Sequence, residues 1–259
     1  MNKVLKYTLL GICGGLLAAC ITAAFIAGIF DRKDITCSRL VVQIADSTQN
    51  RFVTTAEIRK CLRHQYGNYI GTAIDSIDIR KVEEIVDAMS AVQKSQAYVT
   101  KDGALHIDIT QRKPVVRLQN GNKGFYADRE GYIFPLQKTF SSHVHIVEGE
   151  IPINIDSGHQ GEITDPGQRD WLLKIVELVC YMEENKEWEE KVVQIHVSKG
   201  GDLILIPREG KERFLFGQPE NISDKFDKIK KYYTAIIPEK GKEAYRSVDV
   251  RYKGQIICK

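Results

Sequence analysis

The sequence lacks the residue patterns that usually accompany an enzyme active site. It contains no GxSxG, no Walker loop, no HExxH, and no GxGxxG behind a predicted strand. Each of these patterns puts a nucleophile, a metal ligand or a phosphate-binding backbone where the chemistry needs it. Their absence favours a binding or scaffolding protein over an enzyme, with no catalytic residue, no cofactor and no small-molecule substrate.

An excess of charge of one sign is also missing. The chain has 37 Lys and Arg residues against 34 Asp and Glu, a formal net charge of +3, and the charges are evenly spread. Domains that bind nucleic acid gather positive charge on one face. We therefore expect no nucleic-acid partner.

The sequence offers no clear set of metal ligands. No CxxC spacing links Cys37, Cys61, Cys180 and Cys258, so a zinc site or redox pair is not indicated, and their disulfide state stays open. His143 and His145 would point to the same side of a strand, but a third ligand is not evident. We expect no bound metal.

The chain has one long apolar run, Tyr7–Phe30, which carries no charged residue. A helix of this length reaches roughly 36 Å, enough to cross a hydrocarbon core of about 30 Å. A cleaved signal peptide usually has a shorter apolar core. Leu17-Ala18-Ala19-Cys20 has the form of a lipobox, but the residues after Cys20 stay apolar as far as Phe30. We predict an intact transmembrane helix, and processing at Cys20 stays open.

The orientation of this helix is less clearly encoded. Lys3 and Lys6 precede the run, and Arg32 and Lys33 follow it closely, so the balance of positive charge is nearly even. The sequence leans slightly toward a cytoplasmic N-terminus. The segment 1–30 is therefore predicted to anchor a polar body of about 229 residues, enough for one large or two small domains.

Residues 31–111 predict a first domain of strand, helix, helix, strand, strand. Residues 40–44 form the first strand, and Thr54 with Glu57 forms a capping box at the start of a helix. A second amphipathic helix follows near 77–91, and a hairpin turns at Lys101-Asp102-Gly103. A three-stranded sheet with two helices on one face is the compact arrangement of this order.

Residues 112–259 predict a second domain with a mixed or antiparallel sheet and packed helices. Strands are expected in 115–118, 124–127, 132–134, 192–197, 203–207 and 213–216. One helix is expected to begin after Asp165, with Pro166 in its first position and Gln168 completing a capping box. Another begins at Ser223 and carries Tyr233. The fold class is therefore α+β behind a transmembrane helix.

The last predicted strand is Ser247–Tyr252. Its alternation puts Val248, Val250 and Tyr252 on one face, opposite Asp249 and Arg251. On the residues alone, an ordinary core strand is the favoured interpretation of this segment.

Several motifs in order resemble the bacterial division family FtsQ, also called DivIB. Gln111-Arg112-Lys113-Pro114-Val115-Val116 is similar to the family's E-R-x-P-V-A boundary after a POTRA domain, with Gln111 in place of the acid. The segment 126–134 resembles its lid-x-x-G-x-vf hairpin, and Val147-Glu148-Gly149 its l-x-G segment. Residues 247–252 resemble its closing y-V-D-L-R-Y strand. The likeness spans essentially the whole chain.

The resemblance implies a non-enzymatic assembly factor of the divisome at the division septum. It would cross the inner membrane once, with its body in the periplasm, and link early division proteins to septal peptidoglycan synthesis. The implied partners are FtsB and FtsL, with FtsB adding a strand at the C-terminal edge of the sheet. The partner-binding residues implied are Val248, Asp249, Val250, Arg251 and Tyr252.

A second function class stays open from the sequence. A POTRA-bearing anchor or lipoprotein that handles exported β-proteins would carry the same first domain. The ligand of that domain and the stoichiometry of a complex are not encoded in any recognisable pattern. A mature N-terminus at Cys20 would favour this alternative.

Overall fold

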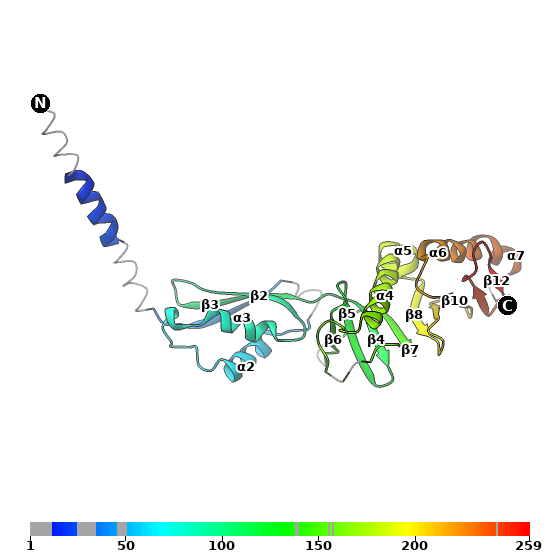
Figure 1. Ribbon diagram of the computed structural model, residues 1–259, viewed down its shortest axis with the longest axis horizontal. Coiled ribbons are helices and arrows are strands. Elements are labelled where there is room, and N and C mark those ends of the chain that lie inside the picture. Colours follow the sequence, from blue (N-terminus) through cyan, green and yellow to red (C-terminus); the bar gives the residue numbers. More distant parts are fainter. Residues whose placement is uncertain are drawn as a thin grey trace, which may run out of the picture. The chain divides into compact units, whose positions relative to one another are not determined.

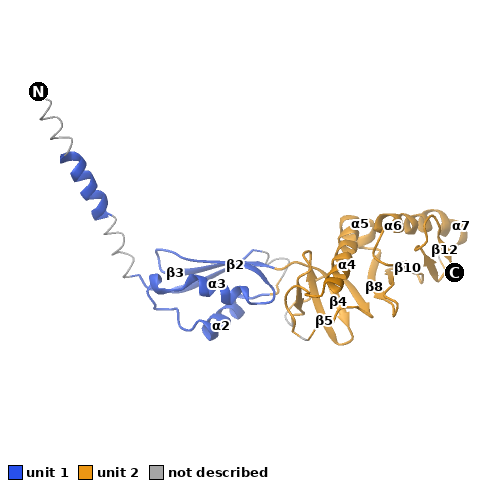
Figure 2. Ribbon diagram, viewed as in Figure 1, with its two compact units in different colours: residues 1–49, 53–111 blue, residues 50–52, 112–259 orange. Residues whose placement is uncertain are grey.

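The computed structural model describes residues 12–24, 35–45, 51–137, 140–154, 156, 158–241 and 243–259. The chain divides into two compact units (Figure 2): unit 1 holds residues 1–49 and 53–111, and unit 2 holds residues 50–52 and 112–259. Each unit has its own sheet, and the two are described separately.

Residues 12–24 form a helix within the predicted span. The two ends of that span, 7–11 and 25–30, lie outside the described residues. Among the residues that are described, no helix combines the length and the apolar character that crossing a membrane requires.

Unit 1 is built on a three-stranded sheet in the order β1-β3-β2 (Figure 1). Strand β3 pairs in parallel with β1 and antiparallel with β2. The elements are β1 Arg39–Ile44, α2 Thr55–Gln65, the 3-10 turn η1 Ile74–Ser76, α3 Ile79–Asp87, β2 Val92–Val99 and β3 Ala104–Gln111. The predicted order of strand, helix, helix, strand, strand is confirmed.

The core of unit 1 is formed in part by β3, in which buried apolar residues alternate with more exposed polar residues. Leu105, Ile107 and Ile109 are buried, while the residues between them are partly exposed. Ile58 on α2 and Val82 on α3 are fully buried as well. One face of the sheet is therefore covered and the other faces solvent, as expected for helices packed on one side.

Helix α2 begins as its sequence predicts. The Thr54 side chain accepts a hydrogen bond from the Glu57 backbone N–H at 3.3 Å, and a Glu57 carboxylate oxygen accepts from the Thr54 N–H at 2.8 Å. The capping box is therefore complete, and it satisfies two of the backbone N–H groups that a helix start leaves unpaired.

The outer edge of β2 is closed by side chains of α3. The Ser95 N–H donates to Asp87 Oδ1 and the Ala97 N–H donates to Glu83 Oε1, both at 2.7 Å. An unpaired strand edge normally offers such N–H groups to another chain. Here two carboxylates already occupy them.

Unit 2 is built on a nine-stranded mixed sheet in the order β12-β11-β10-β9-β8-β7-β4-β5-β6. The strands are β4 Pro114–Asn120, β5 Lys123–Asp128, β6 Ile133–Pro135, β7 His145–Gly149, β8 Val192–Val197, β9 Leu203–Pro207, β10 Arg213–Gly217, β11 Ser247–Asp249 and β12 Ile257–Cys258. Strands β4 and β7, β7 and β8, and β10 and β11 pair in parallel, and the other neighbours pair antiparallel. The prediction of a mixed sheet is confirmed.

The helices of unit 2 lie along one face of this sheet (Figure 1). They are α4 Pro166–Glu184, α5 Lys186–Glu189, α6 Ile222–Lys231, the π-helix η2 Tyr232–Ile236 and α7 Ile237–Lys240. Leu172 and Val179 of α4 and Phe226 of α6 join Ile195 and Phe214 of the sheet in one continuous core. Helices α4 and α6 therefore bury their apolar residues in this core.

Two details of unit 2 differ from the sequence-based prediction. Gln168 does not complete a capping box, because its side chain accepts the Asn154 N–H at 2.9 Å while Asp165 alone caps α4. The last helix is not one regular α-helix, because the π-helix η2 interrupts it from Tyr232 onward. The first difference arises from a contact between residues 14 positions apart in the sequence.

The boundary motif also has a clear structural role. The Gln111 side chain accepts the Val53 N–H at 2.9 Å within unit 1. In unit 2, Asp128 Oδ1 accepts the N–H groups of Glu130 and Tyr132, which fixes the β5–β6 turn. In both the boundary motif and the hairpin motif, a side chain therefore accepts backbone hydrogen bonds and stabilises the local conformation.

Candidate partner-binding edge

The strand predicted to form the open edge of the sheet lies inside it. Strand β11 pairs in parallel with β10, with Val248 opposite Phe214, and antiparallel with β12, with Val248 opposite Cys258. Both of its flanks are therefore occupied. The expectation that Val248–Tyr252 forms the free edge is wrong, because the last residues of the chain fold back over it.

The edge is formed instead by β12. Ser247 and Lys259 exchange two backbone hydrogen bonds, at 3.0 and 2.9 Å. In an antiparallel pair the bonded positions alternate, so the N–H and C=O of Cys258 point away from β11. Within the described part of the chain, no strand pairs with this outer side.

The predicted strand Ser247–Tyr252 ends early, at Asp249. The Arg251 N–H and guanidinium both donate to the Asp249 carboxylate, at 2.7 to 3.1 Å, and the guanidinium also reaches Asp202 at 2.8 Å. Lys228 Nζ, on α6, donates to the carbonyls of Val250 and Tyr252 at 2.9 and 2.6 Å. These side chains take groups that a longer strand would offer to a neighbour.

The five predicted site residues consequently have different surroundings. Val248 and Val250 are fully buried in the core, and Asp249 is 8% exposed. Arg251 and Tyr252 are on the surface, and Tyr252 is 50% exposed. Tyr252 does not share the face of Val248 and Val250, because the pleat ends before it.

Charge at this site is held in a fixed arrangement. The hydrogen bonds from Arg251 lower the pKa of Asp249 and outweigh its partial burial. The same carboxylate, with that of Asp202, raises the pKa of Arg251. Such bidentate pairs fix geometry as well as charge, so Arg251 is positioned beside the ring of Tyr252, 5.8 Å from its centre.

One apolar residue at this edge was missed by the sequence-based prediction. Ile257 lies on β12 and is 37% exposed, one of the few large apolar side chains on the described surface. The available sequence signal was Gly254 followed by Ile256 and Ile257, and in the structure Gly254 has a φ of +71°. Such a turn between apolar residues indicates a hairpin.

The two histidines considered as ligands do not form a site. His145 is buried and His143 is exposed, so the pair does not present a common face. In the described ranges no group of three His, Cys, Asp or Glu side chains is placed to hold a metal ion. The four cysteines of the body are free thiols.

A family model described as FtsQ/DivIB, C-terminal related, matches residues 113–259, more than half of the chain. The chain belongs to this family. A second model, described as a POTRA-like domain, matches residues 35–110. No curated protein matches the chain.

Membership in FtsQ/DivIB supports a role in cell division. The two matches together cover both units, and the resemblance seen in the sequence motifs is confirmed. Domains of these two kinds are non-catalytic.

Proposed function

We propose that this protein is a non-enzymatic assembly factor of the divisome. It links early division proteins to septal peptidoglycan synthesis by binding FtsB- and FtsL-like single-span proteins. Tyr7–Phe30 anchors it in the inner membrane at the septum, with the N-terminus in the cytoplasm and the body in the periplasm. Family membership supports the division role, and the apolar run supports the anchor.

The open side of β12 is the observation that carries this proposal. A partner segment would add there as a further strand, bonding the outward N–H and C=O of Cys258. Tyr252 and Ile257 stand exposed at the same end of the sheet. The proposed contact therefore moves from β11 to β12, and Arg251 and Tyr252 remain in it as side-chain contacts.

Typical interaction free energies indicate that backbone and side chains contribute differently to binding of the partner. Each backbone hydrogen bond contributes about 1 kcal/mol net, and a two-residue edge offers few of them. A buried aromatic anchor adds about 2 kcal/mol or more. The side chains of Tyr252 and Ile257 would therefore supply most of the affinity, and anchoring in one bilayer would raise the effective concentration of the partner.

The decisive experiment compares partner capture with folding. The full chain in detergent is tested against an FtsB-like partner, with Tyr252→Ala and Cys258→Pro as variants. Cys258→Pro removes an N–H that points outward and replaces a partly buried thiol by a ring of similar size, so the pairing of β11 with β12 should persist. Both variants should lose capture by about tenfold or more and keep the wild-type melting temperature.

Lys240→Ala, on the exposed end of α7, serves as the matched control and should bind normally. Unchanged capture by both variants would exclude β12 as the docking edge. Depletion in cells addresses the wider proposal, since a division factor should leave cells as long filaments. Cells that divide normally without the protein would contradict it.

A further inference from the structure

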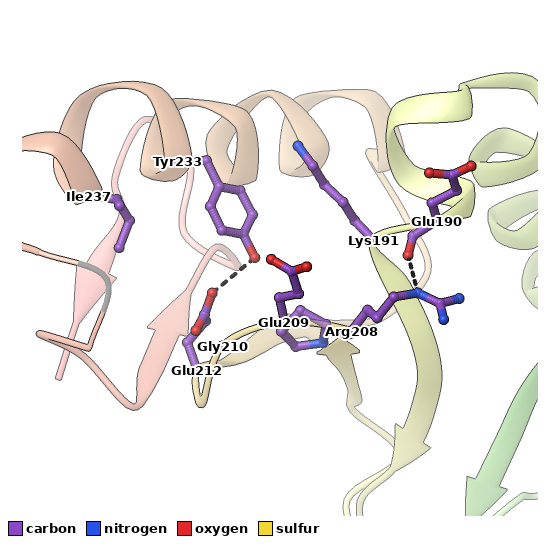
Figure 3. Close-up of a pocket in the computed structure, with 9 residues that line it drawn as sticks. Glu190, Lys191, Arg208, Glu209, Gly210, Glu212, Tyr233 and Ile237 are labelled. Carbon is purple, nitrogen blue, oxygen red and sulfur yellow. Dashed lines mark hydrogen bonds between the residues drawn. The ribbon is translucent and has the colours of Figure 1, made fainter.

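A cavity of about 690 Å³ in unit 2 has no role in the proposed docking edge (Figure 3). It lies between η2 and α7 on one side and the β9–β10 turn on the other. Its lining comprises Glu190, Lys191, Pro207, Arg208, Glu209, Gly210, Glu212, Tyr233 and Ile237. Three of these are carboxylates and two are cations.

Glu212 is the unusual member of this lining. The residue is only 4% exposed, although a buried carboxylate normally has a cation or several donors beside it. Tyr233 Oη donates to Oε1 at 2.9 Å, whereas Oε2 has no hydrogen-bond partner among the described residues. A carboxylate accepts about four hydrogen bonds, so most of its capacity is unused.

The surrounding backbone is shaped to keep the carboxylate in place. Gly210 has a φ of +102°, and a Cβ on it would collide with the Glu212 carboxylate. Burial raises the pKa of Tyr233, and the negative charge of Glu212 and the hydrogen bond to it raise it further. The hydroxyl therefore stays protonated as a donor and holds the Glu212 carboxylate in the wall of the cavity.

Neither cation of the lining pairs with Glu209 or Glu212, although Lys191 Nζ lies 5.2 Å from the ring centre of Tyr233. Lys191 Nζ contacts Glu187 Oε1 at 3.0 Å, and Arg208 Nε donates to the Glu190 carbonyl at 2.8 Å. In Figure 3 the side chains of Glu209 and Glu212 both extend toward Tyr233. No ion pair is formed by either carboxylate within the described part of the chain.

We propose that this cavity binds a primary ammonium group carried on an aliphatic arm, as in a lysine side chain. The ammonium would donate to Glu212, with Glu209 adding charge at the opening. Its three donors and compact charge suit an acceptor with several free positions. The aliphatic arm would contact Pro207 and Ile237, which supply the apolar part of the lining.

This inference is independent of the proposed division role, because the lining of the cavity includes none of the residues assigned to the docking edge. The test measures binding of Nα-acetyl-lysine methylamide to the full chain in detergent by calorimetry. The norleucine analogue has a similar aliphatic arm without the ammonium. The lysine derivative should bind saturably and at least about tenfold more tightly than the norleucine derivative.

Glu212→Gln keeps the shape of the side chain and removes its charge, so it should weaken binding of the lysine derivative by at least about tenfold. Glu243→Gln, an exposed carboxylate paired with Lys211, is the matched control and should bind as the wild type does. Equal affinity in Glu212→Gln, equal affinity for the two derivatives, or no saturable binding would overturn the proposal.

A second pair of variants tests the proposal without changing Glu212, in case Glu212→Gln does not fold. Ile237 is only partly buried on α7, so Ile237→Lys should fold and place its own ammonium in the cavity. That variant should lose binding of the free lysine derivative, while Ile237→Met should keep it. Wild-type affinity in Ile237→Lys would also overturn the proposal.

Discussion

The guanidinium of Arg112 lies 3.3 Å above the ring centre of Tyr132 and donates to Asp128 Oδ2 at 2.8 Å. The side chains of Arg112 and Asp128 are 12% and 8% exposed, so the ion pair is largely shielded from water. It joins the first residue of unit 2 after the boundary to the β5–β6 turn. The contact gives the boundary motif and the turn motif one shared structural role, because Arg112 of the first pairs with Asp128 of the second.

Arg112→Met should destabilise unit 2 by about 3 kcal/mol, because it leaves the Asp128 carboxylate buried without its partner. Urea titration followed by tryptophan fluorescence can measure this, since both tryptophans, Trp171 and Trp188, lie in unit 2. Arg39→Met, which removes the exposed pair of Arg39 with Asp102, is the control. Equal midpoints for Arg112→Met and the wild type would contradict this prediction.

Lys228→Met should destabilise the segment after β11 by about 1 to 2 kcal/mol. The variant leaves the carbonyls of Val250 and Tyr252 without their charged donor. Faster hydrogen exchange across 250–256 is the expected measurement. Lys231→Met, an exposed lysine on the same helix, should exchange like the wild type, and identical behaviour of the two variants would disprove this role of Lys228.

His145 should make unit 2 less stable at mildly acidic pH. Burial lowers the pKa of His145, and the Val192 backbone and the charge of Glu189 oppose this shift only in part. Since the unfolded chain then binds the proton more readily, stability is complete above about pH 6.5 and falls as the pH drops toward the folded-state pKa.

Unfolding free energies measured from about pH 7.5 to 5 check this prediction. His145→Gln should have a shallower decline than the wild type over that range, whatever its stability at neutral pH. His143→Gln changes an exposed histidine two residues away and should keep the wild-type slope. A wild-type slope in His145→Gln would rule out this histidine as the cause.

Thr54→Ala should destabilise the start of α2 by about 1 kcal/mol, because it removes the acceptor of the Glu57 N–H. Hydrogen exchange of the first-turn amides should accelerate accordingly. Thr55→Ala changes the first helical residue, which makes no capping bond, and should not accelerate exchange. Similar exchange in both variants would argue against the capping box.

Local chemistry made much of the fold predictable. The capping box at Thr54 and the alternation along β3 depend on residues a few positions apart, so the sequence encodes them directly. The mixed sheet of unit 2 followed from its turn residues and short apolar runs. Its strand order did not, because parallel pairing of β4 with β7 and β10 with β11 depends on long connections.

The candidate site could be predicted only in part from the sequence. Val248 and Val250 alternate as a strand should, and both are indeed buried. The early end of β11 depends on Lys228, more than twenty positions away, and on Asp202. Strand β12 has only two residues, too few for a periodic signal. The burial of Glu212 could not be predicted either, because it depends on contacts with Tyr233, 21 positions away, and with Gly210.

The two carboxylates at the outer edge of β2 should affect how the protein behaves at high concentration. Because Asp87 and Glu83 accept the amides of Ser95 and Ala97, two copies of the protein cannot pair through β2 without first breaking those bonds. High local density should therefore not drive these molecules into β2-to-β2 fibrils.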